Sequence, residues 1–272
     1  MARRGATLFE VIITTGVYSL MVIAVFLILR GGLRAWHNVE SRQKAQRDLR
    51  RVHLQVLEDL KTASSTHLDF KPWGQGKFGA ANGDALWFLS SKVPATYPAP
   101  YAQTFARNPS NGEPLWQVNV LYYTVVPDNH TTCAGFRDPD GYDTACPHKY
   151  LIKKVIDLND QSSDPNDPDE VEPLLTPAEV DTYLTAPPAP YALSGMVTGA
   201  VVPGSVQVIA DALLSFRVQR PGGGGPVGLT TRAVRLVEAS HARSGPIKLG
   251  QADMSSDPFT LEYKTWVVPG NR

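Results

Sequence analysis

The chain contains only two cysteines among its 272 residues, which excludes a metal site built from four cysteines. Its 26 basic and 26 acidic residues balance, and the missing basic excess argues against a dedicated nucleic-acid-binding protein. Proline is absent from the first 71 residues, and all 22 prolines lie at or beyond Pro72. Because proline interrupts helices, this distribution predicts a helical N-terminus followed by a body of strands and loops.

Sequence patterns of catalysis are also missing. The chain has no H-E-x-x-H, no G-x-S-x-G, no Walker loop and no glycine-rich dinucleotide fingerprint. The glycine run Gly222–Gly225 lacks the Lys-Ser/Thr pair that a phosphate-binding loop needs, and the six histidines are scattered. We therefore expect a protein that is not an enzyme and that needs no cofactor.

Charge is nearly absent from Ala6–Leu29, a run of 24 residues whose only ionisable side chain is Glu10. A helix of this length would cross the hydrocarbon core of a bilayer, which is roughly 30 Å thick. The run is longer than the apolar region of a secretory signal peptide, and no small-residue cleavage site follows it. A plain membrane anchor explains the length but not Glu10, because a carboxylate in a span is costly and usually functional.

The short basic leader Arg3–Gly5, followed by Ala6–Glu10 (Ala-Thr-Leu-Phe-Glu), resembles the cleavage site of type IV prepilins. The resemblance implies that a prepilin peptidase cuts between Gly5 and Ala6 and that the new amine of Ala6 is methylated. It also implies that Glu10 neutralises the Ala6 amine of a neighbouring filament subunit. Ala6 stands where this family usually has Phe. From the residues alone, Glu10 can equally reach the amine of its own chain along the helix surface, and both pairings remain open.

An apolar stripe continues beyond Leu29 at helical spacing. It consists of Leu33, Trp36, Leu49, Val52, Val56, Leu57 and Leu60. We expect the helix to continue to about residue 62, with a bend or loosening at Gly31-Gly32. Eight basic and four acidic residues lie between Arg30 and Lys61, which suits either a solvated helix face or a charged seam between filament subunits.

The rest of the chain alternates strand and turn signals, which predicts an α+β fold with the long helix packed on an antiparallel sheet. Trp116–Val126 has the two-residue period of a half-buried strand, whereas the middle of Ser205–Arg220 is open between helix and strand. Further strands are expected at Leu86–Leu89, Lys149–Leu158, Thr231–Glu238 and Phe259–Val268, and a loop at Pro221–Pro226.

The order of the C-terminal segments resembles that of large minor pilins and J-type pseudopilins. The similar segments are Val208–Val218, Arg232–Val237 and a last strand that ends in Val268-Pro269. The absence of proline from the span also suits these subgroups. The expected organisation is a leader at 1–5, a transmembrane and assembly helix at 6–29, its amphipathic continuation at 30–62 and a β-rich body at 63–272.

The resemblance implies a minor pilin or pseudopilin at or near the tip of a type IV pilus or a type II secretion pseudopilus. Its partners would be other pilins, the prepilin peptidase and the inner-membrane assembly platform, with no specific nucleic acid. It would cross the inner membrane once, with its body in the periplasm or on the cell surface. The alternatives are an anchored envelope-binding protein outside any filament and a tethered exported hydrolase. Secretion, motility, adhesion and DNA uptake all remain open.

Cys133 and Cys146 enclose twelve residues. Because an exported body enters an oxidising compartment, we expect a disulfide between them. With His130 and His148 the same cysteines could instead hold tetrahedral zinc. In this sequence the flanking residues are rich in Asp, Gly and Pro, and the ligand order is not that of a usual zinc finger.

An acidic segment lies between Asp138 and Asp181, with twelve acidic and three basic residues. Its carboxylate and amide oxygens could bind calcium, although their spacing matches no EF-hand and two prolines restrict the chain. A solvated surface loop is the other interpretation. The calcium candidates are Asp164, Asn166, Asp167, Asp169 and Glu170.

Overall fold

The protein combines one long helix with an antiparallel sheet, which confirms the predicted α+β class. This computed structural model describes residues 7–73, 83–97, 99–128, 149–158, 165–168, 171–189, 191–221, 225–234 and 260–270. The expected cleavage site, the two cysteines and seven of the twelve acidic residues of the acidic segment lie outside the described residues.

Seven strands make up the sheet in the described part of the chain, and their spatial order repeats their order in the sequence. They are β1 (Ala63–Trp73), β2 (Gly83–Ser90), β3 (Val118–Val125), β4 (Lys149–Ile156), β5 (Gln207–Gln219), β6 (Val227–Val234) and β7 (Thr260–Val267). Each strand pairs antiparallel with the next. The short helices α2 (Pro177–Tyr183) and η1 (Ser194–Met196) lie between β4 and β5.

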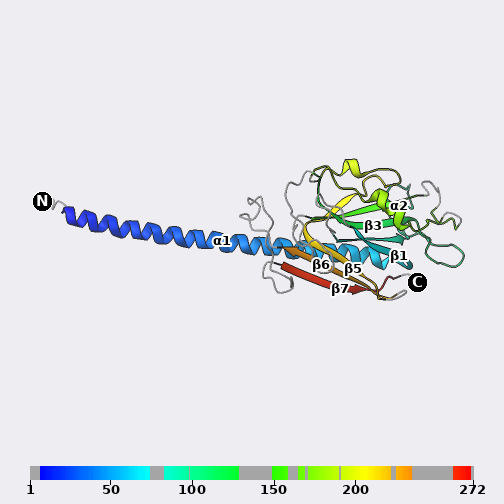
Figure 1. The fold of residues 1–272 in the computed structure, drawn as a ribbon, viewed down its shortest axis with the longest axis horizontal. Coiled ribbons are helices and arrows are strands. Elements are labelled where there is room, and N and C mark those ends of the chain that lie inside the picture. The colour runs from blue at the N-terminus through cyan, green and yellow to red at the C-terminus, as the bar shows by residue number, and fades with distance from the viewer. Residues whose placement is uncertain are drawn as a thin grey trace.

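The helix α1 (Leu8–Lys61) has 54 residues, so it is about 80 Å long. Its first half extends away from the body, and its second half lies against the sheet (Figure 1). The chain stays helical through Gly31 and Gly32, where we expected a bend or a loosening. Two glycines lower helix propensity by only about 1 kcal/mol each, and the apolar residues on both sides favour the helix.

The buried stripe of α1 begins at Ala45 and continues through Leu49, Val52, Val56 and Leu60. The predicted stripe was correct in this half of the helix. It was wrong at Leu33 and Trp36, whose side chains are 61% and 69% exposed because the helix has not yet reached the body there. Helical periodicity alone could not distinguish the part that packs on the sheet from the part that projects.

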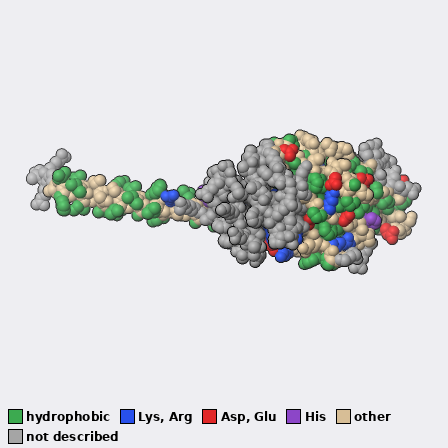
Figure 2. Space-filling view, viewed as in Figure 1, with side chains coloured by type: hydrophobic (Ala, Val, Ile, Leu, Met, Phe, Trp, Pro, Cys, Tyr) green, Lys and Arg blue, Asp and Glu red, His purple; other side chains and the backbone are tan. Residues whose placement is uncertain are grey.

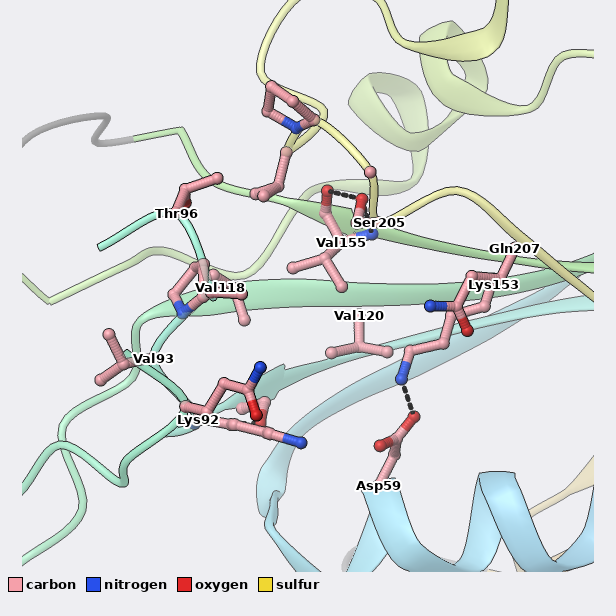
Figure 3. A pocket seen from close by; sticks show the side chains of 17 residues that line it. Asp59, Lys92, Val93, Thr96, Val118, Val120, Lys153, Val155, Ser205 and Gln207 are labelled. Carbon is pink, nitrogen blue, oxygen red and sulfur yellow. Dashed lines mark hydrogen bonds and ion pairs between the residues drawn. The ribbon is translucent and has the colours of Figure 1, made fainter. Parts of the chain in front are cut away.

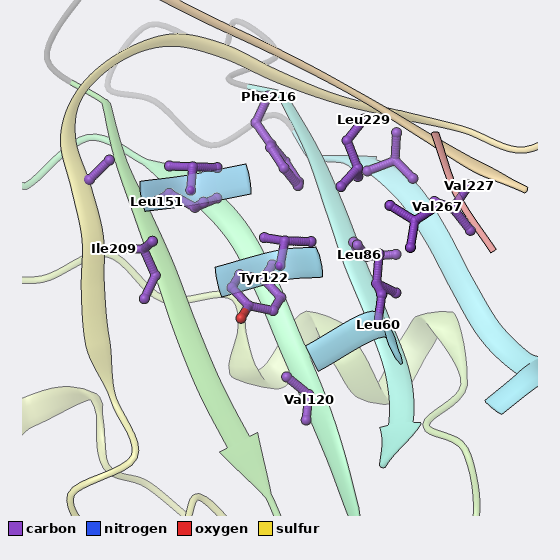
Figure 4. Packing of buried hydrophobic residues seen from close by; sticks show 14 of the residues in the cluster. Leu60, Leu86, Val120, Tyr122, Leu151, Ile209, Phe216, Val227, Leu229 and Val267 are labelled. Carbon is purple, nitrogen blue, oxygen red and sulfur yellow. The ribbon is translucent and has the colours of Figure 1, made fainter. Parts of the chain in front are cut away.

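One hydrophobic core lies between α1 and the sheet. Figure 4 shows Leu60 of α1 among side chains of the sheet, including Leu86, Tyr122, Phe216 and Val267. Removing apolar surface from water stabilises the fold by roughly 25 cal/mol per Å², and this burial holds the C-terminal part of α1 to the sheet.

A second core lies on the opposite face of β2, β3 and β4, where residues 171–206 form a covering layer. The layer is held by Asn119 of β3, which donates to the carbonyl of Pro173 (2.9 Å) and accepts from the N–H of Leu175 (3.0 Å). As a result all eight residues of β3 are buried. The prediction of a half-buried strand was wrong because the sequence does not reveal that a loop layer covers the second face.

The segment from Gln207 to Gln219 is one continuous strand, β5, so the helical interpretation of its middle was wrong. The residues Ala210–Leu214 have good helix propensity, but pairing with β4 on one side and β6 on the other overrides it. The register shifts between Leu213 and Ser215, which places a bulge or irregularity in this strand.

Candidate functional site

The most distinctive surface of the protein is the projecting half of α1. An 18-residue window of it has a mean hydropathy of 2.5, and none of that window is buried. Figure 2 shows hydrophobic side chains along this whole projection. By length and composition, this part of the helix could be a membrane anchor or a signal sequence. The same unbroken helix continues into the core of the body. Cleavage of a signal sequence after the apolar run would therefore divide this helix.

Glu10 lies in the first turn of α1 and closes a capping box with Thr7. Its carboxylate Oε2 accepts hydrogen bonds from the backbone N–H of Thr7 at 2.9 Å and from the Thr7 hydroxyl at 3.1 Å. The N–H of Glu10 donates in return to Thr7 Oγ1 at 3.4 Å. The carboxylate therefore has a partner within its own chain. The pattern Thr-x-x-Glu signals such a cap, but our sequence reasoning considered only the Ala6 amine.

Cationic side chains collect where α1 approaches the body. Those of Arg42, Arg47, Arg50 and Arg51 are all exposed. Arg50 and Arg51 make no hydrogen bond or ion pair with the described part of the chain. Exposed Leu54 lies one turn further along the same face as Arg47 and Arg50. This exposed cationic surface can attract an acidic partner.

An ion pair joins the C-terminal end of α1 to the sheet. Asp59 is buried in the last turn of the helix, and its Oδ2 lies 2.5 Å from Lys153 Nζ on β4. The hydroxyl of Tyr122 on β3 donates to the same oxygen. Burial, together with the negative charge of Asp59, raises the pKa of Tyr122 well above its usual value, so the hydroxyl stays protonated and able to donate.

A second polar contact joins α1 to β5 at the other end of the body. Lys44 Nζ lies 3.5 Å from Asp211, which also accepts a hydrogen bond from the hydroxyl of Tyr191. Asp48 is half-buried and lies one helical turn after Lys44. Burial, with repulsion from Asp211, raises the pKa of Asp48. The buried contact of Asp59 holds the C-terminal end of α1, and the more exposed contact of Lys44 adds a weaker attachment near the start of the packed part.

A pocket of about 250 Å³ opens beside the ion pair of Asp59 (Figure 3). Valines of β3 and β4 form its apolar wall, and Lys92 lies across from Lys153. The hydroxyl of Ser205 is bonded to the backbone of Val155, accepting from its N–H at 3.2 Å and donating to its carbonyl at 3.3 Å. Because this serine is held by backbone groups, the pocket is better suited to contact a small partner group than to perform nucleophilic chemistry.

The remaining candidate residues are hardly covered by the structure. Gly5, Ala6, Cys133, Cys146 and the zinc alternative lie outside the described residues, so cleavage and disulfide remain predictions. Of the calcium candidates only Asn166 and Asp167 are described, and Asn166 Oδ1 accepts from the backbone N–H of Arg107 at 3.1 Å. Within the described ranges, no three His, Cys, Asp or Glu side chains come together as a metal site.

Comparison with protein-family models, with curated protein sequences and with solved structures finds no match. What can be stated is therefore architectural. An N-terminal hydrophobic helix packs with its second half on an antiparallel sheet, and this is a pilin-like architecture.

Proposed function

We propose that the protein is a minor pilin or pseudopilin, processed by a prepilin peptidase and assembled at or near the tip of a type IV pilus or a type II secretion pseudopilus. The observation that carries this proposal is the division of α1 into two unequal parts. The longer part before Ala45 is mostly exposed and largely apolar, while the shorter part from Ala45 onward is packed against the body.

A filament subunit needs a helix that can pack against helices of other subunits, and a body that is firmly attached to this helix. The projecting half of α1 spans roughly 55 Å up to Lys44, which is longer than a bilayer core. Leu33 and Trp36 therefore lie beyond the expected span, still exposed and ready for contact with another helix. The ion pair of Asp59 and Lys153 adds a polar attachment between the packed half and the sheet.

The partners we propose are other pilin-like subunits along α1, the prepilin peptidase and the inner-membrane assembly platform. The exposed arginines between Arg42 and Arg51 favour a neighbour with an acidic surface. The body would lie in the periplasm or on the cell surface, and we assign it no reaction of its own.

A membrane-anchored binding protein that never enters a filament is the competing proposal. It accounts for the apolar half of α1 equally well. It does not require a cut after Gly5, and it gives Glu10 no role beyond capping the helix through Thr7. Processing therefore separates the two proposals.

The test is to express the full chain in a bacterial host without a prepilin peptidase, and then to co-express an active or a catalytically dead peptidase. Mass spectrometry of the purified protein should find loss of residues 1–5 and a methylated Ala6 only with the active enzyme. Gly5→Leu should remain uncut, since by resemblance the peptidase depends on that glycine. An intact N-terminus beside the active enzyme would favour the plain anchor.

A further inference from the structure

The sheet face that points away from α1 is polar over β5, β6 and β7. Along these strands alternate residues point to opposite faces, and Phe216, Val218 and Val267 belong to the core under α1. The residues that alternate with these core-facing positions point to the sheet face away from α1. They are Arg217, Gln219, Gly228, Thr230, Arg232, Glu262, Lys264 and Trp266.

This polar face lies beside the layer that covers β2, β3 and β4. The core under that layer includes only Val208 from the three C-terminal strands among the described residues. A cavity of about 260 Å³ lies on β5–β7 instead, lined by Arg217, Thr230, Arg232, Lys264 and Trp266. The cavity is on the far side of the sheet from α1, so a subunit that assembles through α1 would leave it accessible.

Glu262 holds two of the three cations in place. Its carboxylate lies 2.5 Å from Arg232 Nε and 2.8 Å from Lys264 Nζ. Burial acts to raise the pKa of Glu262, but hydrogen bonds and attraction from Lys264 and Arg232 outweigh it and lower the pKa. The described contacts use only Nε of the Arg232 guanidinium, so its terminal N–H groups remain available. Among the described residues of this ion-pair network, Arg232 and Lys264 carry two positive charges against the single negative charge of Glu262, so the network keeps a net positive charge.

Trp266 adds a flat apolar surface to the cationic site. It pairs with Gly228 across β6 and β7, and a Cβ added to Gly228 would lie 2.7 Å from the indole ring. The indole therefore lies directly over the glycine backbone, and its side chain remains 57% exposed. A ring with an apolar face can stack on it while an anionic group on the same ring reaches the cations.

We propose that this cavity binds an anionic sugar unit of a polysaccharide, such as a uronic acid. A sugar ring presents an apolar face to Trp266, a carboxylate to the Arg232–Lys264 pair, and hydroxyls to Thr230 and Gln219. A nucleic acid strand is less suitable, because it needs a track of cations and stacked aromatic rings. The site has a single indole, which could stack on only one base. An acidic peptide lacks the ring that would use the indole face.

The test measures binding of trigalacturonate to the full chain in detergent micelles by calorimetry. Maltotriose serves as the neutral control sugar, and a short thymidine oligonucleotide and a glutamate-rich peptide as other anions. We expect saturable binding of trigalacturonate that weakens with salt, and none of maltotriose. Lys264→Gln and Trp266→Ala should each weaken it about tenfold, the effect of losing about 1.4 kcal/mol.

Two variants far from the cavity are matched controls. Arg50→Gln removes an exposed charge from α1, and Trp36→Ala removes an exposed indole from the same helix. Both should bind trigalacturonate like the unaltered protein. Lys264 and Trp266 are themselves mostly exposed, so their replacement should leave the circular dichroism unchanged. Absence of trigalacturonate binding, equal binding of maltotriose, or tighter binding of the oligonucleotide or the peptide would overturn the proposal. Equal losses in the control variants would do so as well.

Discussion

Lys153 Nζ on β4 lies 2.5 Å from Oδ2 of Asp59, and this ion pair joins the sheet to the last turn of α1. The two side chains are only 14% and 11% exposed, and Tyr122 donates its hydroxyl to the same carboxylate oxygen. A pull on the projecting half of α1 is therefore transmitted to the central strands through a polar contact as well as through the apolar core. The residues lie 94 positions apart in the sequence.

Replacement of Asp59 by Ala should strongly destabilise the body. It leaves the Lys153 ammonium and the Tyr122 hydroxyl without their shared acceptor, and breaking such a buried pair costs about 3–5 kcal/mol. Denaturant unfolding of the full chain in detergent measures the loss. Glu58→Ala, one residue away on the exposed side of α1, is the control and should change stability by no more than about 0.5 kcal/mol. Equal midpoints for the two variants would contradict the structural role of the ion pair.

His53 should make the protein sensitive to acid. Burial lowers its pKa from 6.5 to about 4, since the ring lies against Tyr263 at a centroid distance of 4.3 Å and is almost inaccessible. Between pH 6.5 and 4 the unfolded chain binds a proton at this ring and the folded chain does not. Stability should therefore fall as the pH drops through this window, by up to roughly 3 kcal/mol.

The measurement for His53 is the free energy of unfolding at several pH values between 4 and 7, for the unaltered protein and for His53→Phe. Phe can keep the ring contact with Tyr263 but cannot bind a proton, so its curve should be flatter. His37→Ala on the exposed side of α1 should keep the slope of the unaltered protein. Parallel curves for His53→Phe and the unaltered protein would mean that protonation of His53 does not cause the loss of stability in acid.

Gly228→Ala should displace the indole of Trp266. The added methyl group would lie 2.7 Å from the ring, closer than side-chain carbons approach, and the exposed ring is free to swing away. Fluorine NMR of fluorotryptophan-labelled protein follows this ring once its resonance is assigned with Trp266→Phe. Gly195→Ala, where nothing lies within 4 Å of the new Cβ, should leave the resonance in place. An unchanged Trp266 signal in Gly228→Ala would contradict the stacking.

The pairing of Cys133 with Cys146 remains a prediction, because both lie outside the described residues. Non-reducing peptide mapping of protein exported to the periplasm should find them joined. Closing a loop of about 15 residues stabilises a fold by roughly 3 kcal/mol in the chain-entropy model, so reductant should lower the unfolding midpoint. Two free thiols, or zinc at a stoichiometric level, would favour the alternatives instead.

The local pattern of the sequence was enough to predict the class and most elements of the fold. Each expected strand has a counterpart, because Trp116, Val118, Val120 and Tyr122 occupy every second position and Phe259–Lys264 alternates apolar and polar residues. The stripe of α1 was correct from Leu49 to Leu60 because its apolar residues recur at helical spacing. The strand β1 was not among the expected strands, since its first residues Ala63–Thr66 are mostly polar and resemble a loop.

What could not be predicted depends on residues distant in the chain. Full burial of β3 requires the layer of residues 171–206, and no local signal places that layer over it. No local sequence signal predicts the contact of Asp59 with Lys153 or that of Glu262 with Arg232. These contacts join strands and helices whose relative placement follows from the whole fold.

Glu10 is the residue on which the assembly proposal depends, and its contact with Thr7 supplies a matched control. Glu10→Ala removes the carboxylate and its half of the capping box but keeps the bond from the N–H of residue 10 to Thr7 Oγ1, whereas Thr7→Ala removes that bond and keeps the carboxylate. Losing a charge makes the span more apolar, so membrane insertion should persist in both variants. If the carboxylate neutralises the amine of a neighbouring subunit, only Glu10→Ala should fail to assemble.

The most direct measurement is the amount of this subunit in sheared filaments relative to the membrane fraction, quantified by immunoblot in a strain with the complete assembly machinery. We expect Thr7→Ala to be incorporated almost normally and Glu10→Ala to fall by about a hundredfold or more, since an unpaired buried charge costs about 3–5 kcal/mol and each 1.4 kcal/mol is a factor of ten. Equal incorporation of Glu10→Ala and the unaltered protein, with normal processing of both, would contradict the assembly role and leave α1 as a plain anchor.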